Sequence, residues 1–165
     1  NQTPVEIGNT DAEGRLLLAD ALTYCQESNV KSDFIIDFAT LTGAARVALG
    51  TELPALFTNN DNLGNEILNE GMKQVDPMWR LPLFRPYNKQ LDKKNNAVSS
   101  TGSSGTGGAI TAALFLNRFI NKNTNWAHID LMAWNNSSRP GFPMGGEAMG
   151  LRSIVNMIIK YCSKS

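Results

Sequence analysis

Asp11, Glu13 and Arg15 bring two carboxylates and a guanidinium together within five residues. In an extended segment the side chains at positions i, i+2 and i+4 point to the same face, so these three groups would form one charged cluster. Two neighbouring carboxylates repel each other unless a cation lies between them, whereas an arginine stays charged and can hold an anion through a two-pronged contact. The spacing therefore predicts a divalent metal ion beside an anion-binding arginine.

The same residues also have a plainer interpretation as the start of a helix. The helix dipole favours acidic residues ahead of an apolar run, and the run 16–22 follows directly. Gly14 is expected to allow the bend from an extended segment into this helix and the close approach of a substrate to the backbone. On spacing alone, both interpretations remain open.

The pattern of apolar residues predicts alternating helices and strands. Helical spacing predicts helices over about 16–28, 44–49, 63–72, 87–91, 109–121 and 150–160. Short apolar runs predict strands over 33–38, 55–58 and 126–132, and the polar segment 92–108 is expected to be a loop. This alternation is typical of an α/β fold, a mixed β-sheet flanked by helices on both faces, with a site where loops converge at the strand ends.

The glycines at 102–108 suggest a second function, nucleotide binding. Backbone amides at the start of the helix that follows could hold a phosphate. However, the segment fits neither of the two common glycine-rich phosphate motifs, and it has no lysine where the phosphates would require one. A turn with close helix packing is the alternative explanation.

Charge and composition narrow the class of protein. The 15 basic and 15 acidic side chains of this 165-residue chain balance, and no basic stripe indicates a nucleic-acid partner. The length suits one domain. Cys25 and Cys162 lie far apart, which argues against a disulfide framework and suits a reducing compartment. Because no apolar run reaches the length of a membrane helix, we expect a cytoplasmic protein with no membrane partner.

The single histidine and the isolated acids are interpreted as structural. His128 lies within a predicted strand, where a lone histidine is usually a hydrogen-bonded core residue. Asp130 would share its face, so a pairing between His128 and Asp130 is open. Solvation or helix capping is enough to explain Asp20, Asp37 and Glu147.

Several longer strings combine in a recognisable order. They are the box Asn-Thr-Asp-Ala-Glu-Gly-Arg at 9–15 with its continuation to 22, and the strings at 34–44, 79–83, 107–113 and 126–130. Together they resemble the leucine aminopeptidase (cytosol aminopeptidase, M17) family of two-metal exopeptidases over nearly the whole chain. The resemblance implies a zinc-peptidase-like fold and a metal-dependent aminopeptidase that removes N-terminal residues from peptides.

The resemblance also assigns roles to the charged residues of the box. It implies that Asp11 and Glu13 are carboxylate ligands of two divalent ions, Mn or Zn, and that Glu13 bridges the two ions. It implies that Arg15 holds a bicarbonate-like anion that serves as general base. In such hydrolases the ions activate a water molecule and polarise the scissile carbonyl.

The substrate cleft is assigned by the same resemblance. Thr40, Leu41 and Gly43 would line it, with Leu41 offering backbone groups and the other two bordering the first side-chain pocket. Met132 and Trp134 stand where many relatives have small residues, and in this respect the chain resembles a bacterial branch of the family. Because this stretch helps to border the pocket, a preference for leucine is in question.

The family's other metal ligands are a lysine and two aspartates, and they belong, with a second catalytic lysine, to motifs that precede the acidic box. Nothing before Asn9 supplies them. We therefore expect residues 1–165 to be the C-terminal part of the catalytic domain, with little metal affinity alone, and the full-length protein to be a homo-hexamer. The alternatives are an inactive fold fragment with only an assembly role and a nucleotide-binding module.

Overall fold

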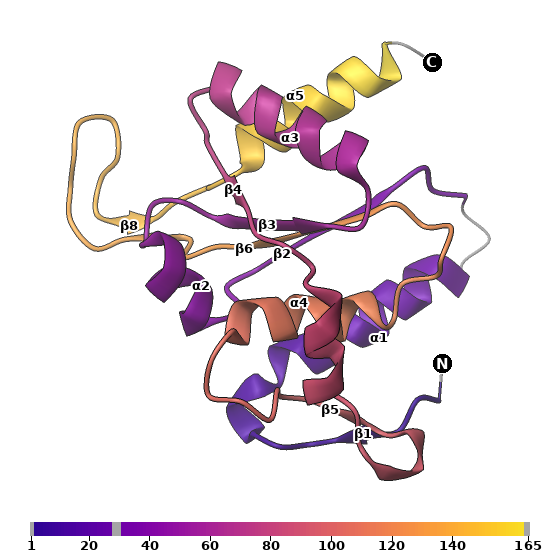
Figure 1. Ribbon diagram of the computed structural model, residues 1–165. Helices are drawn as coiled ribbons and strands as arrows, with labels where there is room; N and C mark the ends of the chain where they lie inside the picture. The colour runs from indigo at the N-terminus through magenta and orange to yellow at the C-terminus, as the bar shows by residue number, and fades with distance from the viewer. Residues whose placement is uncertain (1, 28–30, 164–165) are drawn as a thin grey trace.

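The computed structural model describes residues 2–27 and 31–163, and its centre is a mixed β-sheet between two layers of helices (Figure 1). The strand order is β2-β6-β3-β4. These strands are β2 (Ile35–Ala39), β6 (Trp126–Asp130), β3 (Ala55–Thr58) and β4 (Trp79–Arg80). β2 is parallel to β6, β3 is antiparallel to β6, and β4 is parallel to β3. The predicted α/β class with a mixed sheet is confirmed.

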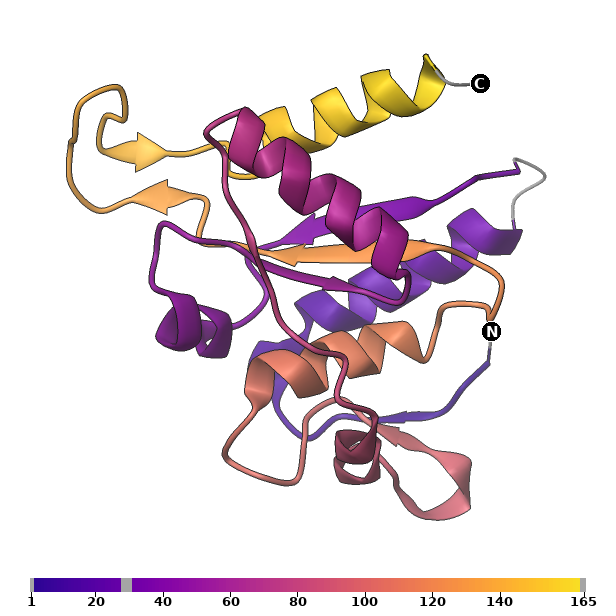
Figure 2. The same cartoon turned by 45° about the horizontal axis from the view of Figure 1, so that its top comes forward.

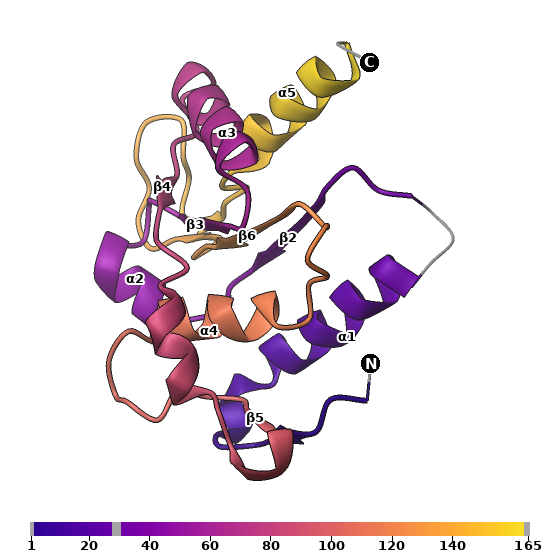
Figure 3. The ribbon, with the colours of Figure 1, turned by 45° about the vertical axis from the view of Figure 1, so that its right-hand side comes forward.

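Helices cover both faces of this sheet (Figures 1 and 3). One layer contains α1 (Gly14–Glu27) and α4 (Gly108–Asn117), with α2 (Gly43–Leu49) beside α4. The other contains α3 (Asp61–Lys73) and α5 (Leu151–Cys162). Alternation along β6 divides the core, because Trp126 joins the apolar cluster under α1 and α4 whereas Ala127 and Ile129 join the cluster under α3 and α5.

Two small sheets and three 3-10 helices complete the described chain. β1 (Val5–Glu6) pairs in parallel with β5 (Val98–Ser99), and β7 (Trp134–Asn135) pairs with β8 (Gly145–Gly146) in an antiparallel hairpin that projects from the body (Figure 2). The 3-10 helices are η1 (Thr10–Ala12), η2 (Arg85–Gln90) and η3 (Lys94–Asn96). The β1–β5 pair places residues 98–100 next to the segment that leads into α1.

Most predicted elements are present, and their ends differ by a few residues. The predicted helix 109–121 ends at Asn117, and the predicted strand 126–132 ends at Asp130. The predicted loop 92–108 is wrong in part, since it contains η3 and β5. Ser28, at the end of the first predicted helix, lies outside the described residues.

The glycine-rich segment 102–108 serves close packing. Gly107 has a positive φ of 71°, a conformation that favours glycine, at the start of α4. A Cβ added to Gly108 would lie 3.1 Å from the Cβ of Ala44, a tight contact, so α4 packs closely against α2 at this glycine. The alternative explanation of these glycines as a turn with close helix packing is therefore confirmed.

The structure places both cysteines and limits which helices could be long and apolar. Cys25 in α1 and Cys162 in α5 are both exposed, and the described residues contain no disulfide. Within the same residues, none of the helices combines the length and the apolar character that spanning a membrane requires.

Candidate active site

The acidic box folds as a helix start and is not extended. Asp11 lies in η1, where its amide donates to Asn9 Oδ1 at 3.0 Å. Glu13 has helical dihedral angles (φ −69°, ψ −34°), and Gly14 begins α1. The prediction that Asp11, Glu13 and Arg15 share one face of an extended segment was wrong, because alternate residues diverge around a helix. The two carboxylates are exposed and Arg15 is buried.

The two carboxylates are available to an external ligand. Neither Asp11 nor Glu13 accepts a hydrogen bond at its carboxylate, or forms an ion pair, within the described part of the chain. Carboxylate oxygens suit hard divalent ions such as Mn and Mg and also bind Zn. Yet no cluster of three potential metal ligands (His, Cys, Asp or Glu) forms among the described residues. The donor chemistry fits a divalent ion, but these residues supply only part of its coordination.

Arg15 is held from one side and left unpaired on another. Its Nη1 donates to the Ser100 carbonyl at 2.7 Å, while its Nε is buried and has no hydrogen-bond partner among the described residues. Burial lowers the pKa of Arg15 below its ordinary value, and attraction to Asp130 partly offsets this shift. A buried, charged donor without a partner is unfavourable unless a ligand completes it. The guanidinium therefore fits an anion.

Ser100 holds the guanidinium of this arginine in place. It is completely buried, and its Oγ accepts a hydrogen bond of 3.0 Å from the Gly8 amide. A Cβ added to Gly8 would lie only 2.5 Å from Thr101 Oγ1, so the segment before the acidic box lies close against this strand end. No local pattern around Ser100 indicated this contact, since 85 residues separate it from Arg15.

Asp130 organises the turn formed by residues 40–43. Its carboxylate is 1% exposed, and its Oδ1 accepts hydrogen bonds from the amides of Leu41 (3.0 Å) and Thr42 (3.1 Å). Its Oδ2 accepts from Thr42 Oγ1 at 2.6 Å, and that hydroxyl oxygen in turn accepts from the Ala45 amide and caps α2. Sequence reasoning missed this role. The sequence signal was limited to an acidic residue within an apolar predicted strand, because the position of Asp130 opposite Ala39, which precedes the turn, comes from strand register.

The 40–43 turn and the acidic box lie next to each other at the carboxyl ends of β2 and β6. A Cβ added to Gly14 would lie 3.6 Å from Leu41 Cδ1, an ordinary contact. Gly14 has no positive φ and begins a regular helix, so the bend expected of it is not observed. Thr40 and Gly43 are exposed, and Leu41 is half-buried. Because the Leu41 amide is engaged by Asp130, the expectation that Leu41 offers backbone groups narrows to its carbonyl.

His128 is a core residue, as expected, but its partner differs from the one considered. Its Nδ1 lies 2.5 Å from Asp37 Oδ1, and Trp126 Nε1 donates to Asp37 Oδ2 at 2.7 Å. Asp37 and His128 are direct neighbours in the parallel β2–β6 pair. The pairing of His128 with Asp130 and the explanation of Asp37 by solvation or capping were therefore wrong. The contacts of Asp37 with His128 and Trp126 depend on strand register, which the sequence alone did not provide.

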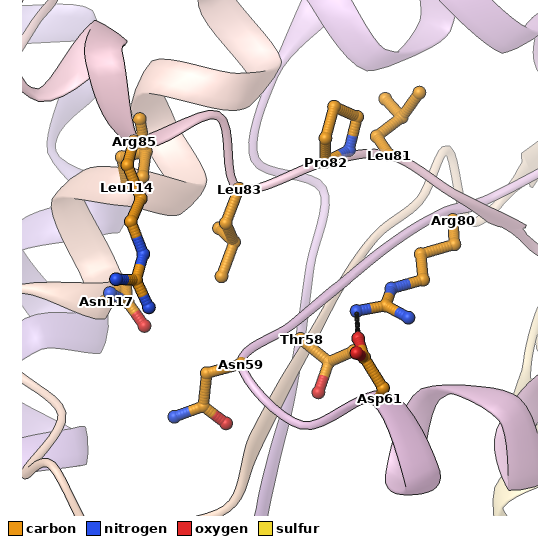
Figure 4. Close-up of a pocket in the computed structure, with 10 residues that line it drawn as sticks. All are labelled: Thr58, Asn59, Asp61, Arg80, Leu81, Pro82, Leu83, Arg85, Leu114 and Asn117. Atoms are coloured by element: carbon orange, nitrogen blue, oxygen red, sulfur yellow. Dashed lines mark hydrogen bonds and ion pairs between the residues drawn. The ribbon is translucent and has the colours of Figure 1, made fainter.

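The hollow drawn in Figure 4 lies away from this strand edge. It has a volume of about 530 Å³ and lies near Thr58, at the end of β3 opposite to the one that pairs with Asp130. Arg80 Nη2 contacts Asp61 Oδ1 at 2.6 Å at its wall, and Arg85 extends toward Asn117 (Figure 4). None of the predicted site residues lines it. The candidate site is therefore defined by its side chains and not by this hollow.

Comparison with known proteins gives consistent matches. The model of the cytosol aminopeptidase family, catalytic domain, matches residues 1–155. A probable cytosol aminopeptidase of Prochlorococcus marinus (strain MIT 9215) is 44% identical over 160 residues, which are 96% of this chain and 32% of that protein. A probable cytosol aminopeptidase of Chlorobium phaeobacteroides is also 44% identical, over 158 residues that are 95% of this chain and 31% of the relative.

Solved structures show the same likeness. The crystal structure of a cytosol aminopeptidase from Coxiella burnetii matches with a TM-score of 0.89 and 49% identity, covering 94% of this chain and 34% of the other. The bottromycin maturation enzyme BotP in complex with Mn matches with a TM-score of 0.87 and 34% identity, covering 93% of this chain and 34% of BotP. The chain thus spans about a third of the length of these proteins.

Proposed function

Because the chain belongs to the cytosol aminopeptidase family, we propose that the protein containing it is a metal-dependent aminopeptidase that hydrolyses the N-terminal peptide bond of peptides. One observation carries this proposal. Among the described residues, the exposed carboxylates of Asp11 and Glu13 have no partners, and the buried Arg15 has an unpaired Nε. The acidic box that contains these residues lies next to the 40–43 turn, whose Leu41 carbonyl accepts no hydrogen bond from the described residues. Metal ligands, an anion site and a peptide-binding backbone are the groups that such a hydrolase requires.

The metal site is proposed at Asp11 and Glu13. These carboxylates would hold two divalent ions, Mn or Zn, with Glu13 shared between them. When bound, such ions supply Lewis-acid activation of the scissile carbonyl and of the attacking water. The presence of Mn in the BotP structure supports this choice of chemistry. Since two carboxylates make an incomplete site for two ions, residues outside this sequence would provide the other ligands.

A binding measurement tests that division of the site. In equilibrium dialysis with Mn or Zn, the 165-residue chain alone is expected to retain little metal. The natural polypeptide is expected to retain two ions. Two tightly held ions on the isolated chain would contradict the proposal that ligands are missing from it.

The proposed role of Arg15 is to hold and orient a bicarbonate-like anion. Its unpaired Nε provides a buried, positively charged donor, and a planar guanidinium matches a planar carboxylate-like anion through two contacts. When bound, such an anion would supply a general base for the attacking water. The contact to Ser100 fixes the guanidinium against rotation, so the anion would be held at a defined position.

The substrate is proposed to bind along the 40–43 turn. The Leu41 carbonyl would accept a hydrogen bond from an N–H of the peptide, and Thr40 and Gly43 would border the first side-chain pocket. Met132 packs against the apolar cluster under α3 and α5, whereas Trp134 is 50% exposed. Trp134 is therefore the better candidate to reshape the pocket and to shift specificity away from leucine.

The assembly proposal is a homo-hexamer of the full-length protein. The rival interpretation, a fold fragment that acts only in assembly, makes a different prediction for a single sample. Scattering mass and a hydrolysis assay on the metal-loaded natural polypeptide separate the two, because the proposed function requires cleavage as well as assembly.

Substitution of the two carboxylates tests the proposed function. In the natural polypeptide, Asp11→Ala and Glu13→Ala are each expected to lower the cleavage of leucyl-p-nitroanilide at least about a hundredfold, because each removes a metal ligand. Asp20→Ala is the matched control, since Asp20 is an exposed carboxylate on the adjoining helix with no ion pair in the described structure. Retained activity in both test variants would refute the assignment.

A further inference from the structure

We propose that Asp130 is a positioning residue for the peptide hydrolysis proposed above, because its carboxylate fixes the 40–43 turn in the orientation that presents backbone carbonyls to the substrate. The inference rests on the proposed function, since the turn has no substrate to position without it. Asp130 is assigned no contact with substrate or metal. It acts through the two amides and the hydroxyl that it binds.

The orientation of the turn follows from peptide geometry. In a trans peptide the N–H and the preceding C=O point in opposite directions, and the described chain has no cis peptide bond. Because the Leu41 and Thr42 amides both point at Asp130 Oδ1, the carbonyls of Thr40 and Leu41 must point away from this buried carboxylate. Two successive acceptors are thereby directed outward.

The carboxylate also links the turn to the helix that follows it. Thr42 Oγ1 donates to Asp130 Oδ2 and accepts from the Ala45 amide, so one hydroxyl joins the strand end to the start of α2. A completely buried carboxylate with three donors is stable only while those donors stay in place. This requirement restricts the turn more strongly than packing of the half-buried Leu41 alone would do.

A second carboxylate in the same chain provides a matched control. Asp76 is also buried, and it accepts hydrogen bonds from the amides of Gly150 (2.8 Å) and Ser153 (3.1 Å) and from Ser153 Oγ (3.1 Å). These donors, two amides and one hydroxyl, are of the same kind as those of Asp130. However, Asp76 binds the start of α5, in the other helical layer (Figure 1). Replacing Asp76 therefore measures what a buried, hydrogen-bonded carboxylate contributes to stability, without changing the contacts of the 40–43 turn.

The experiment uses the natural polypeptide that contains this sequence, loaded with Mn, and compares Asp130→Ala, Asp130→Asn, Thr42→Val and Asp76→Ala. Two quantities are measured: amide hydrogen exchange over residues 40–46, and kcat and KM for leucyl-p-nitroanilide and for a dipeptide. Asp130→Ala is expected to speed exchange in this segment and to lower kcat/KM at least about tenfold, mainly through KM, since hydrogen bonds to a charged group are lost.

The other variants distinguish positioning from general stability. Asp130→Asn retains a carbonyl oxygen that can accept from both amides, so its KM should lie close to that of the wild type and well below that of Asp130→Ala. Thr42→Val removes the hydrogen bond from the hydroxyl to Asp130 Oδ2 and the cap on the Ala45 amide. It leaves both amide bonds to Asp130 in place, so it should give a smaller rise in KM than Asp130→Ala. Asp76→Ala should lower the melting temperature while leaving KM and exchange over 40–46 within about twofold.

The outcomes separate this inference from the proposed function. If the wild-type protein cleaves peptides but Asp130→Ala and Asp76→Ala have the same KM and the same exchange over 40–46, the positioning role is overturned and the aminopeptidase proposal stands. If the metal-loaded wild type cleaves no peptide, both proposals fail. Should Asp130→Ala not fold, Thr42→Val decides, and an unchanged KM in that variant overturns the positioning role.

Discussion

Arg15→Met should affect activity more than stability, because the described part of the folded chain leaves one donor of this buried arginine without a partner and a bound anion would supply one. The side chain is 8% exposed, and its Nε has no hydrogen-bond partner within the described structure. Methionine has a similar length and no charge, so the variant removes the guanidinium with little change in packing. The expected result is a large loss of activity with a smaller change in stability, because two contributions to stability oppose each other.

The magnitude follows from two opposing contributions. Losing the charged hydrogen bond from Nη1 to the Ser100 carbonyl, 2.7 Å long, costs about 1.5–3 kcal/mol. Removing a buried donor that has no partner stabilises the folded state by about 1–3 kcal/mol. This agrees with the burial that lowers the pKa of Arg15. The net change is within about 2 kcal/mol, which corresponds to at most about 8 °C in melting temperature for a domain of this size.

The control for this prediction is Arg118→Met. Unlike Arg15, Arg118 has a partner for its Nε, which donates to Asn88 Oδ1 at 3.3 Å, and its Nη2 donates to Asp92 Oδ1 at 2.6 Å and to the Asn88 carbonyl at 2.8 Å. Its replacement should therefore lower the melting temperature without an effect on turnover.

The assay is thermal melting without metal or bicarbonate, together with hydrolysis of leucyl-p-nitroanilide by the metal-loaded natural polypeptide across bicarbonate concentrations. Arg15→Met should lower kcat/KM at least about a hundredfold and abolish any response to bicarbonate. If the variant instead melts more than about 10 °C lower and keeps wild-type turnover, Arg15 is a structural residue and the reasoning is refuted.

Two further predictions concern stability. Asp37→Ala leaves the His128 ring and one indole N–H buried without their shared acceptor, and urea denaturation should show a loss of about 3–5 kcal/mol; a loss below about 1 kcal/mol would contradict this account. Hydrogen bonds from Lys160 and Lys73 lower the pKa of Glu70. Because the folded state then favours the charged carboxylate, wild type should melt higher than Glu70→Gln at neutral pH, and the difference should shrink as pH falls below the ordinary value of 4.5. A difference independent of pH would exclude this charge effect.

The elements of the fold were predictable because each depends on neighbouring residues. The alternation of Trp126, His128 and Asp130 on one face with Ala127 and Ile129 on the other describes a strand buried on both faces, and the structure has that strand. The predicted strand extended two residues too far, because apolar character continues after Asp130 although pairing with β2 stops there. Short-range pattern gives the kind of element and leaves its ends to long-range pairing.

The acidic box shows the limit of reasoning from spacing. A period of two was assumed for Asp11, Glu13 and Arg15, yet the chain is already turning into α1. The three residues therefore diverge, with two carboxylates exposed and the guanidinium buried against Ser100. The plainer helix-start interpretation was correct for the local structure. It did not exclude a site, because a helix start can present its carboxylates outward and still bury the arginine that follows.

What the sequence could not provide is the registration of distant segments, and the candidate site depends on it. The parallel β2–β6 pair sets Asp130 opposite Ala39 and thereby under the amides of Leu41 and Thr42. The β1–β5 pair adjoins Ser100, which accepts the hydrogen bond from Arg15. A shift of either pair by one residue would turn Asp130 or Ser100 to the opposite face and leave the box and the turn without their contacts. Two residues that were not predicted to belong to the site, Asp130 and Ser100, therefore hold its two predicted halves together.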